Sequence, residues 1–238
     1  TGSSDAPVRE AALWSVALGS LVDPADRTVY LMRLAEDRAA EAQLRADAIR
    51  TLANVRENGV VDGLVRILES EPRVTIALPS RMPTELEIMN LRYAQARDVA
   101  GWAAGALGHL DARIALPLLL RTAEDPKDFF LRQMSLGSLV AWNVPEALPV
   151  LVKGLEDPLP DNRVLALTGL ARLGDPKAVD PVLARLSDAH AEVRVLAVRA
   201  VGHLGGPQVR PQLEAMQQKE SDPLVLGALE AELSRLAR

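Results

Sequence analysis

Two segments of the chain are near copies of each other. Residues 163–174 read Arg-Val-Leu-Ala-Leu-Thr-Gly-Leu-Ala-Arg-Leu-Gly, and residues 194–205, 31 positions later, read Arg-Val-Leu-Ala-Val-Arg-Ala-Val-Gly-His-Leu-Gly. The same step back reaches Arg132, and the same step forward reaches Val225. A fixed period of this size is typical of folds in which copies of one small unit stack on each other. The repeat therefore predicts an array of units rather than a single closed core.

Each copy has the apolar spacing of an α-helix, and a signal that starts another helix follows it. Asp175-Pro176 is the clearest of these signals, because the Asp side chain can cap free N–H groups and Pro suits the first helical position. A further proline recurs inside the helix that follows, and we expect a bend at each: Pro117, Pro149, Pro181 and Pro211. The unit is thus a hairpin of a first helix and a second helix.

The pattern predicts one all-α solenoid domain over residues 1–238, made of about six hairpins. Repeats are expected near 24–57, 58–110, 112–142, 144–173, 175–204 and 206–237, after a leading helix over 8–20. First helices are expected over 24–36, 58–70, 112–124, 144–156, 175–187 and 206–219, and second helices over 41–56, 84–110, 128–142, 161–173, 190–204 and 222–237. One hairpin cannot offset a chain entropy of about 1–2 kcal/mol per residue, so neighbours must bury its faces.

The hairpins resemble those of the HEAT-repeat family, in particular the short bacterial HEAT-like units. The resemblance rests on a proline in the first helix and on an Asp and an Arg six residues apart across the turn: Pro149, Asp157 and Arg163, then Pro181, Asp188 and Arg194. It implies a right-handed α–α superhelix in which this Asp and Arg form hydrogen bonds along the array. The match is sharpest over 112–205 and looser over 24–70 and 206–237.

Some hairpins depart from the family pattern at the turn. Ser70 and Lys219 stand where an Asp is expected, Val225 replaces the Arg, and the turn from Asp125 to Arg132 is longer. We expect the joints between repeats to be softer at these places.

An irregular insertion over residues 71–83 interrupts the period. Its three prolines forbid a continuous helix, although Val74, Ile76, Leu78 and Met82 make it apolar for a loop. Thr84 and Glu87 then form a capping box that starts the long helix expected over 84–110. The favoured interpretation is an insertion that packs against repeats two and three; the other is a flap or a strand on which a partner docks.

Composition excludes several classes of function. The chain has no cysteine, which removes disulfides, thiolate nucleophiles and Cys-based metal sites. With 27 basic and 32 acidic residues, a net charge of −5 and 3% aromatic residues, no nucleic-acid partner is expected. No apolar run is long enough to span a membrane. The compartment stays open: a soluble, cytoplasmic protein is favoured, or an exported one if a signal was removed before Thr1.

The sequence offers no set of residues for catalysis, a cofactor or a metal. His109, His190 and His203 are the three histidines, and stacked helices would hold them too far apart to share an ion. The HEAT-like enzyme that hydroxylates deoxyhypusine uses paired His-Glu motifs, and this chain has no His-Glu dipeptide. Trp102 and Trp142 occupy core positions. Phe129 and Phe130 are either an exposed anchor or buried against the preceding turn.

A stripe of outward positions on the second helices is the remaining candidate site. In the HEAT-like fold these helices line the concave face, where Gly105, Gly137 and Ala141 would leave a smooth middle between cationic ends. The candidate partner-binding residues are Arg50, Asn54, His109, Thr168, Arg172, Arg199 and His203. Such a stripe is either an ordinary polar surface or a groove in which Arg forks hold an acidic peptide.

We therefore predict a non-enzymatic scaffold that binds a partner protein or an acidic peptide on its concave face. Two alternatives rest on analogy with other HEAT-like proteins: a nucleic-acid-binding protein similar to the alkylpurine DNA glycosylases, and an enzyme similar to the bilin lyases. A gel shift at low salt would test the first alternative. A stable absorbance change on mixing the chain with bilin and apoprotein would test the second.

Overall fold

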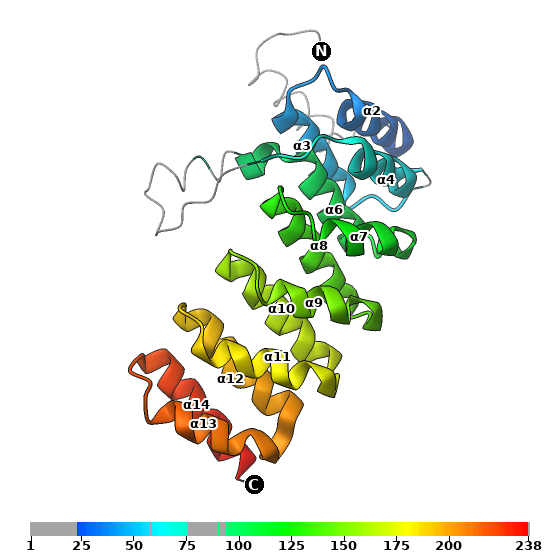
Figure 1. Ribbon diagram of the computed structural model, residues 1–238. Helices are drawn as coiled ribbons and strands as arrows, with labels where there is room; N and C mark the ends of the chain where they lie inside the picture. The colour runs from blue at the N-terminus through cyan, green and yellow to red at the C-terminus, as the bar shows by residue number, and fades with distance from the viewer. Residues whose placement is uncertain (1–22, 58, 76–89, 91–93, 238) are drawn as a thin grey trace. The chain divides into compact units, whose positions relative to one another are not determined.

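The computed structural model describes residues 23–57, 59–75, 90 and 94–237 (Figure 1). These residues form helices and turns with no strand, so the predicted all-α class of helical repeats is confirmed. The described chain divides into two compact units, residues 1–138 (unit 1) and 139–238 (unit 2), and each is described by itself. The leading helix predicted over 8–20 and the capping box at Thr84 lie outside the described residues. The grouping of all the hairpins into one domain stays a prediction.

Unit 1 is built from helices that pack through fully buried leucine, isoleucine and alanine side chains. Its elements are α2 (Pro24–Glu36), α3 (Ala42–Leu52), α4 (Val60–Ser70), α6 (Val99–His109), the 3₁₀ helix η1 (Arg113–Ala115), α7 (Leu116–Thr122) and the beginning of α8 (Phe129–Trp142). α2 packs against α3 and α4, and α6 packs against the same two helices. Leu31, Ile49, Leu64 and Leu107 are fully buried at these contacts.

Unit 2 repeats one hairpin design three times. Its elements are η2 (Pro145–Ala147), α9 (Leu148–Gly154), α10 (Pro160–Leu173), η3 (Pro176–Ala178), α11 (Val179–Leu183), η4 (Ala184–Ser187), α12 (Ala191–Gly205), η5 (Gly206–Val209), α13 (Arg210–Gln217) and α14 (Pro223–Leu236). The second helices lie side by side, because α12 packs against both α10 and α14 (Figure 1). Leu167, Leu170, Val198 and Leu229 are fully buried in this core.

The recurring prolines do not bend the middle of a helix as the sequence suggested. Each first helix of the later hairpins opens with a 3₁₀ turn, and the proline falls in the first turn of the α-helix that follows. At Pro117, Pro149 and Pro211 the carbonyl four residues back already accepts from the residue just before the proline, so the missing N–H leaves no acceptor unpaired and the usual interior cost does not arise. The interruption of the first helix is therefore a change from 3₁₀ to α geometry just before the proline.

The long second helix predicted over 84–110 is wrong in its described part. Residues 94–97 are helical, Asp98 is not, and α6 begins at Val99. The side chain of Asp98 caps α6 by accepting a hydrogen bond from the N–H of Gly101 at 2.8 Å. An Asp satisfies a free N–H more favourably as a cap than it serves inside a helix, which explains the break.

The aromatic side chains are used for packing. Phe129 is 4% exposed and Phe130 is 7% exposed, so burial, rather than an exposed anchor, is confirmed. The ring of Phe130 meets Trp102 edge to face with 5.4 Å between the centroids. Trp142 is buried, whereas Trp102 is only half-buried and its indole N–H donates to the carbonyl of Gln95 at 3.0 Å.

Candidate functional site

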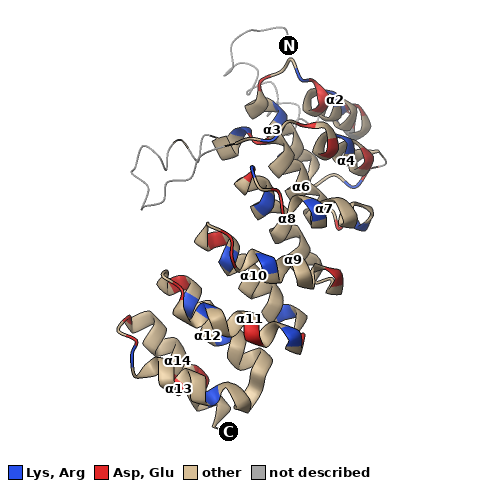
Figure 2. Cartoon of the chain, viewed as in Figure 1, with Lys and Arg blue, Asp and Glu red and all other residues tan. Residues whose placement is uncertain are grey.

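The turns before α10 and α12 carry paired charges of opposite sign, as Figure 2 shows. Arg163 donates to the carbonyl of Asp157 in its own turn at 2.8 Å and forks onto both carboxylate oxygens of Asp188 in the next turn, each at 2.9 Å. Arg194 repeats this arrangement, donating to the carbonyl of Asp188 at 2.9 Å and to the carboxylate of Glu220 at 2.7 Å. Each arginine thus ties its own turn to the next hairpin.

At Ser70 and Lys219, where softer joints are predicted, the following residue supplies the missing carboxylate. Glu71 accepts a fork from Arg45 with two N···O distances of 2.7 Å, and Glu220 accepts the fork from Arg194. Glu has one methylene more than Asp, so its carboxylate reaches the arginine from one position further along the chain. The pairing survives the loss of the Asp at the expected position.

Electrostatics agree with this geometry. Hydrogen bonds from Arg194 and from the N–H of Asp222 lower the pKa of Glu220 from 4.5 to about 2. Burial alone would raise the pKa of Asp188, but the hydrogen bonds from Arg163 and the N–H of His190 outweigh it and lower that pKa. These charges are committed to holding hairpins together, so they are not free to bind a ligand.

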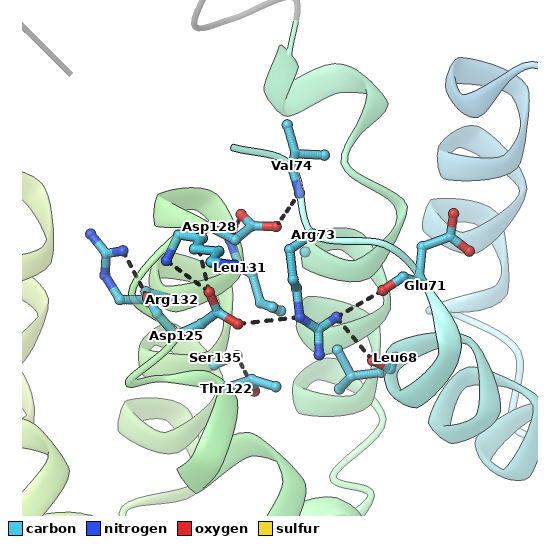
Figure 3. Close-up of polar contacts among 12 residues, drawn as sticks. Leu68, Glu71, Arg73, Val74, Thr122, Asp125, Asp128, Leu131, Arg132 and Ser135 are labelled. Carbon is cyan, nitrogen blue, oxygen red and sulfur yellow. Dashed lines mark hydrogen bonds and ion pairs between the residues drawn. The ribbon is translucent and has the colours of Figure 1, made fainter. Parts of the chain in front are cut away.

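The start of the insertion is fastened to the turn before α8 (Figure 3). The N–H of Val74 donates to the carboxylate of Asp128 at 3.0 Å. Arg73 pairs with Asp125 at 3.2 Å and donates to the carbonyls of Leu68 and Glu71, each at 3.2 Å. Residues 71–75 therefore favour the packing interpretation, while residues 76–83 lie outside the described part of the chain.

Asp98 and Asp128 form a buried acidic pair beneath this segment. Each is 1% exposed, and each caps a helix, since Asp128 accepts from the N–H of Leu131 at 2.9 Å. Burial, followed by the neighbouring charge of Asp128, raises the pKa of Asp98 from 3.8 to about 8. Asp98 is therefore mainly protonated at neutral pH. The two carboxyl groups can then lie together in one buried site without two negative charges.

In unit 1 the candidate residues lie in different surroundings. Arg50 pairs with Asp47 at 3.1 Å, and its guanidinium carbon lies 5.2 Å from the centre of the Trp102 ring. The charge of Arg50 therefore already has partners within the protein. Asn54 and His109 are exposed. The expected smooth surface at Gly105 is wrong, because a β-carbon there would collide with the side chain of Met134. That glycine allows close packing of α6 against α8.

In unit 2 the structure brings four candidate residues together around one cavity. Thr168 and Arg172 of α10 face Arg199 and His203 of α12 across a hollow of about 340 Å³. The residues between them are apolar: Leu167, Ala171, Leu196 and Ala200. We call this cavity the α10–α12 groove. Its volume lies at the lower end of the range of about 300–1,000 Å³ that is typical of ligand pockets.

The apolar residues of the groove are the part that sequence reasoning missed. Leu167 and Ala200 are buried at the base, while Ala171 and Leu196 are half-buried. Their helical spacing predicts that all of them belong to the core. This is true of Leu167 and Ala200, whereas Ala171 and Leu196 are partly exposed in the groove. The signal available in the sequence was size: alanine at 171 and 200 leaves a hollow where a leucine would fill the space.

The charges of the α10–α12 groove are uncompensated. Arg172, Arg199 and His203 are exposed, and none of the lining residues in this described part of the chain is Asp or Glu. No ion pair or hydrogen bond engages either guanidinium among the described residues. The hydroxyl of Thr168 donates to the carbonyl of Val164 at 2.8 Å, so it is already satisfied. The groove can therefore offer two arginine forks to a carboxylate-bearing ligand.

A second cavity of about 520 Å³ lies between the turns that lead into α12 and α14. Arg194, Asp188 and Glu220 form part of its lining, and all three already belong to the arginine pairs that join the hairpins. With Lys219 also in the lining, two positive and two negative side chains balance there. This cavity lacks the one-sided charge of the α10–α12 groove.

Neither a metal site nor a membrane span was found in the part of the chain that the structure describes. No cluster of three or more His, Asp or Glu residues is placed to hold an ion within residues 23–57, 59–75, 90 and 94–237. Across the same ranges, no helix combines the length and apolar character needed to cross a bilayer.

Comparison with known proteins finds a repeat family that is similar to part of the chain. Residues 148–234, which contain the α10–α12 groove, match the family described as HEAT repeats. The resemblance read from the Asp and Arg of the turns is thereby confirmed. No curated protein sequence matches the chain.

Several solved structures share the fold of the chain. The complex of CpcE and CpcF of phycocyanin lyase from Nostoc sp. PCC7120 aligns with a TM-score of 0.59 and 22% identity, covering 89% of this chain and 77% of that one. A designed armadillo repeat protein in complex with the peptide (KR)4 aligns with a TM-score of 0.56 and 17% identity, covering 87% and 98%. At these identities the likeness establishes a shared HEAT/armadillo-like fold.

Proposed function

We propose that the protein is a non-enzymatic scaffold whose α10–α12 groove binds an acidic segment of a partner protein. The observation that carries this proposal is the groove itself: two exposed arginines without partners in the described chain, above an apolar base, with no acidic residue in the lining. A partner carboxylate would gain charge-assisted hydrogen bonds there without displacing an internal ion pair.

The distribution of charge over the rest of the chain also favours an acidic partner at the groove. The protein carries a net charge of −5, so an acidic partner would be repelled by most of its surface and attracted at the groove. In unit 2 other arginines, such as Arg163 and Arg194, are already bound to carboxylates of the turns. Arg172 and Arg199, by contrast, stay free within the described chain, side by side where α10 meets α12, which favours a defined site there.

Repeat proteins of this fold can bind extended peptides, and a neighbour illustrates the mode. The designed armadillo repeat protein is described in complex with (KR)4, a peptide of alternating basic residues. We propose the same kind of contact with the charges reversed, because arginines line the groove here. A rigid helical surface suits such binding, since little conformational entropy is lost from the scaffold.

Partner capture with a double variant tests the proposal. Arg172→Ala with Arg199→Ala should weaken capture of the native partner from the source organism and should reduce the salt dependence of binding. Arg33→Ala with Arg121→Ala is the matched control, because it removes two exposed arginines from the first helices α2 and α7. Equal capture by both double variants would contradict the assignment of the site.

A bilin-lyase-like activity is the second candidate. The CpcE–CpcF complex belongs to a phycocyanin lyase and shares the fold, and an apolar pigment with carboxylate side arms would also suit a groove of apolar base and arginine rim. Incubation with bilin and apoprotein distinguishes the two candidates. A stable absorbance change that depends on Arg172 and Arg199 would favour the enzyme, and its absence would favour the scaffold.

A further inference from the structure

We infer that the α10–α12 groove recognises a mixed signal: one large apolar side chain that fills its base, flanked in sequence by acidic residues that meet its arginines. The inference rests on the proposed function and narrows it from acidic partners in general to one class of segment. It follows from the chemistry of the lining residues, of which half are apolar.

The base of the groove is built to receive an apolar group. Leu167 is fully buried and Ala200 is 2% exposed, so the bottom is closed by the protein core. Ala171 and Leu196 form half-buried walls. A purely acidic peptide would leave this surface wet, whereas an inserted aliphatic or aromatic side chain would displace that water, at a gain proportional to the area covered.

The rim of the groove is built to receive carboxylates on more than one side. The 31-residue repeat places Thr168 opposite Arg199 and Arg172 opposite His203, so the two arginines occupy diagonal corners. Residues four apart on a helix lie about 5–6 Å from each other, and long arginine side chains extend this reach. Carboxylates before and after a central apolar residue could therefore both be met.

An apolar base with a charged rim is the arrangement found in tight protein–protein interfaces. Binding energy concentrates in an anchor side chain that enters a desolvated pocket, while charged groups at the rim add orientation and partner choice. Neither part of the groove suffices alone, because an apolar anchor without acids lacks the charge match and acids without an anchor leave the base unfilled. The two features together predict selectivity for both.

Fluorescence anisotropy with three labelled peptides tests the inference. Their central sequences are Glu-Glu-Leu-Glu-Glu, Glu-Glu-Ser-Glu-Glu and Lys-Lys-Leu-Lys-Lys. We expect the first peptide to bind at least about tenfold more tightly than either of the others, which is about 1.4 kcal/mol. Ala171→Leu, which extends a larger side chain from the wall into the hollow and leaves both arginines, should abolish the preference for Leu over Ser and keep the preference for Glu over Lys.

The outcomes separate this inference from the proposed function. Equal binding of the Leu and Ser peptides, both lost in the Arg172→Ala, Arg199→Ala double variant, would overturn the apolar anchor and leave the acidic site standing. Equal binding of the Glu and Lys peptides, unaffected by the double variant, would overturn both. Circular dichroism of Ala171→Leu verifies its fold, and unchanged Leu preference in a folded variant would also overturn the anchor.

Discussion

Neutralising Glu220 removes the negative charge from the ion pair that joins the last two hairpins of unit 2 and nearly keeps the shape of the side chain. In Glu220→Gln the remaining oxygen can still accept from the N–H groups of Ser221 and Asp222, which now bond Glu220 at 2.9 Å. The new NH2 group cannot accept from the Nε–H of Arg194, so the ionic fork is reduced to at most one neutral hydrogen bond from Nη2 to the remaining oxygen. The variant therefore isolates the contribution of one charge to the joint between the last two hairpins.

The size of this effect follows from the pKa of Glu220. A shift from 4.5 to about 2 corresponds to about 3 kcal/mol in favour of the ionised, folded form. The Arg194 side chain is 17% exposed and Glu220 is 8% exposed at the protein edge. Because solvent screens such a pair, we expect Glu220→Gln to lower the free energy of unfolding by about 1–2 kcal/mol at neutral pH.

The sign of the pH dependence is fixed by the lowered pKa. The folded carboxylate holds its proton more weakly than the unfolded one, so its stabilisation is present above about pH 4.5 and is lost as the pH falls toward about 2. The difference between the natural protein and Glu220→Gln should therefore shrink over that range.

Hydrogen exchange resolved along the chain is the suitable assay, because repeat arrays need not unfold in one step. Peptides from α13 and α14 should exchange faster in Glu220→Gln, with little change in α9. Glu214→Gln is the matched control, since Glu214 pairs with Arg210 at the same 2.7 Å but is 48% exposed. We expect that control to change stability by at most about 0.5 kcal/mol. Equal effects of the two variants would refute the reasoning from burial.

Three further predictions concern single positions. Gly202→Ala should destabilise unit 2 by about 1–3 kcal/mol in thermal unfolding, because the new β-carbon would collide with Glu232. Gly227→Ala, on the exposed side of α14 where nothing lies within 4 Å, should instead stabilise it by about 0.5–1 kcal/mol. The raised pKa of Asp98 means that its stabilisation is complete below about pH 3.8 and is lost as the pH rises through about 8. Melting temperatures between pH 6 and pH 9 should therefore fall more steeply in the natural protein than in Asp98→Asn, and parallel curves would contradict the protonated pair.

The helices of the later hairpins could be predicted closely from the sequence. The second helices expected over 128–142, 161–173, 190–204 and 222–237 begin and end within one residue of α8, α10, α12 and α14. The reason is physical: the apolar spacing and the Asp-Pro or Gly signals at the ends agree with each other in these segments. Where local signals disagreed, at Asp98, a single capping side chain decided the boundary.

The ion pairs that join the hairpins were harder to predict, because they depend on how far a side chain reaches rather than on its position within the repeat. Aligning the repeats column by column showed Ser70 and Lys219 as losses, yet Glu71 and Glu220 supply the carboxylates from one residue later. Likewise, the alignment could not show that Arg50 lies on Trp102 while Arg172 and Arg199 stay free, since these contacts join residues far apart in the sequence. Side-chain length and tertiary contact carry this information.

Methyl NMR of the full chain with labelled leucines tests the central claim most directly. Titration with the Glu-Glu-Leu-Glu-Glu peptide should shift the methyl signals of Leu167 and Leu196 in the α10–α12 groove. The signals of Leu183 and Leu186, which line the cavity of about 520 Å³ in unit 2, should stay in place. Shifts at Leu183 and Leu186 with none at Leu167 and Leu196 would contradict the assignment of the groove as the binding site.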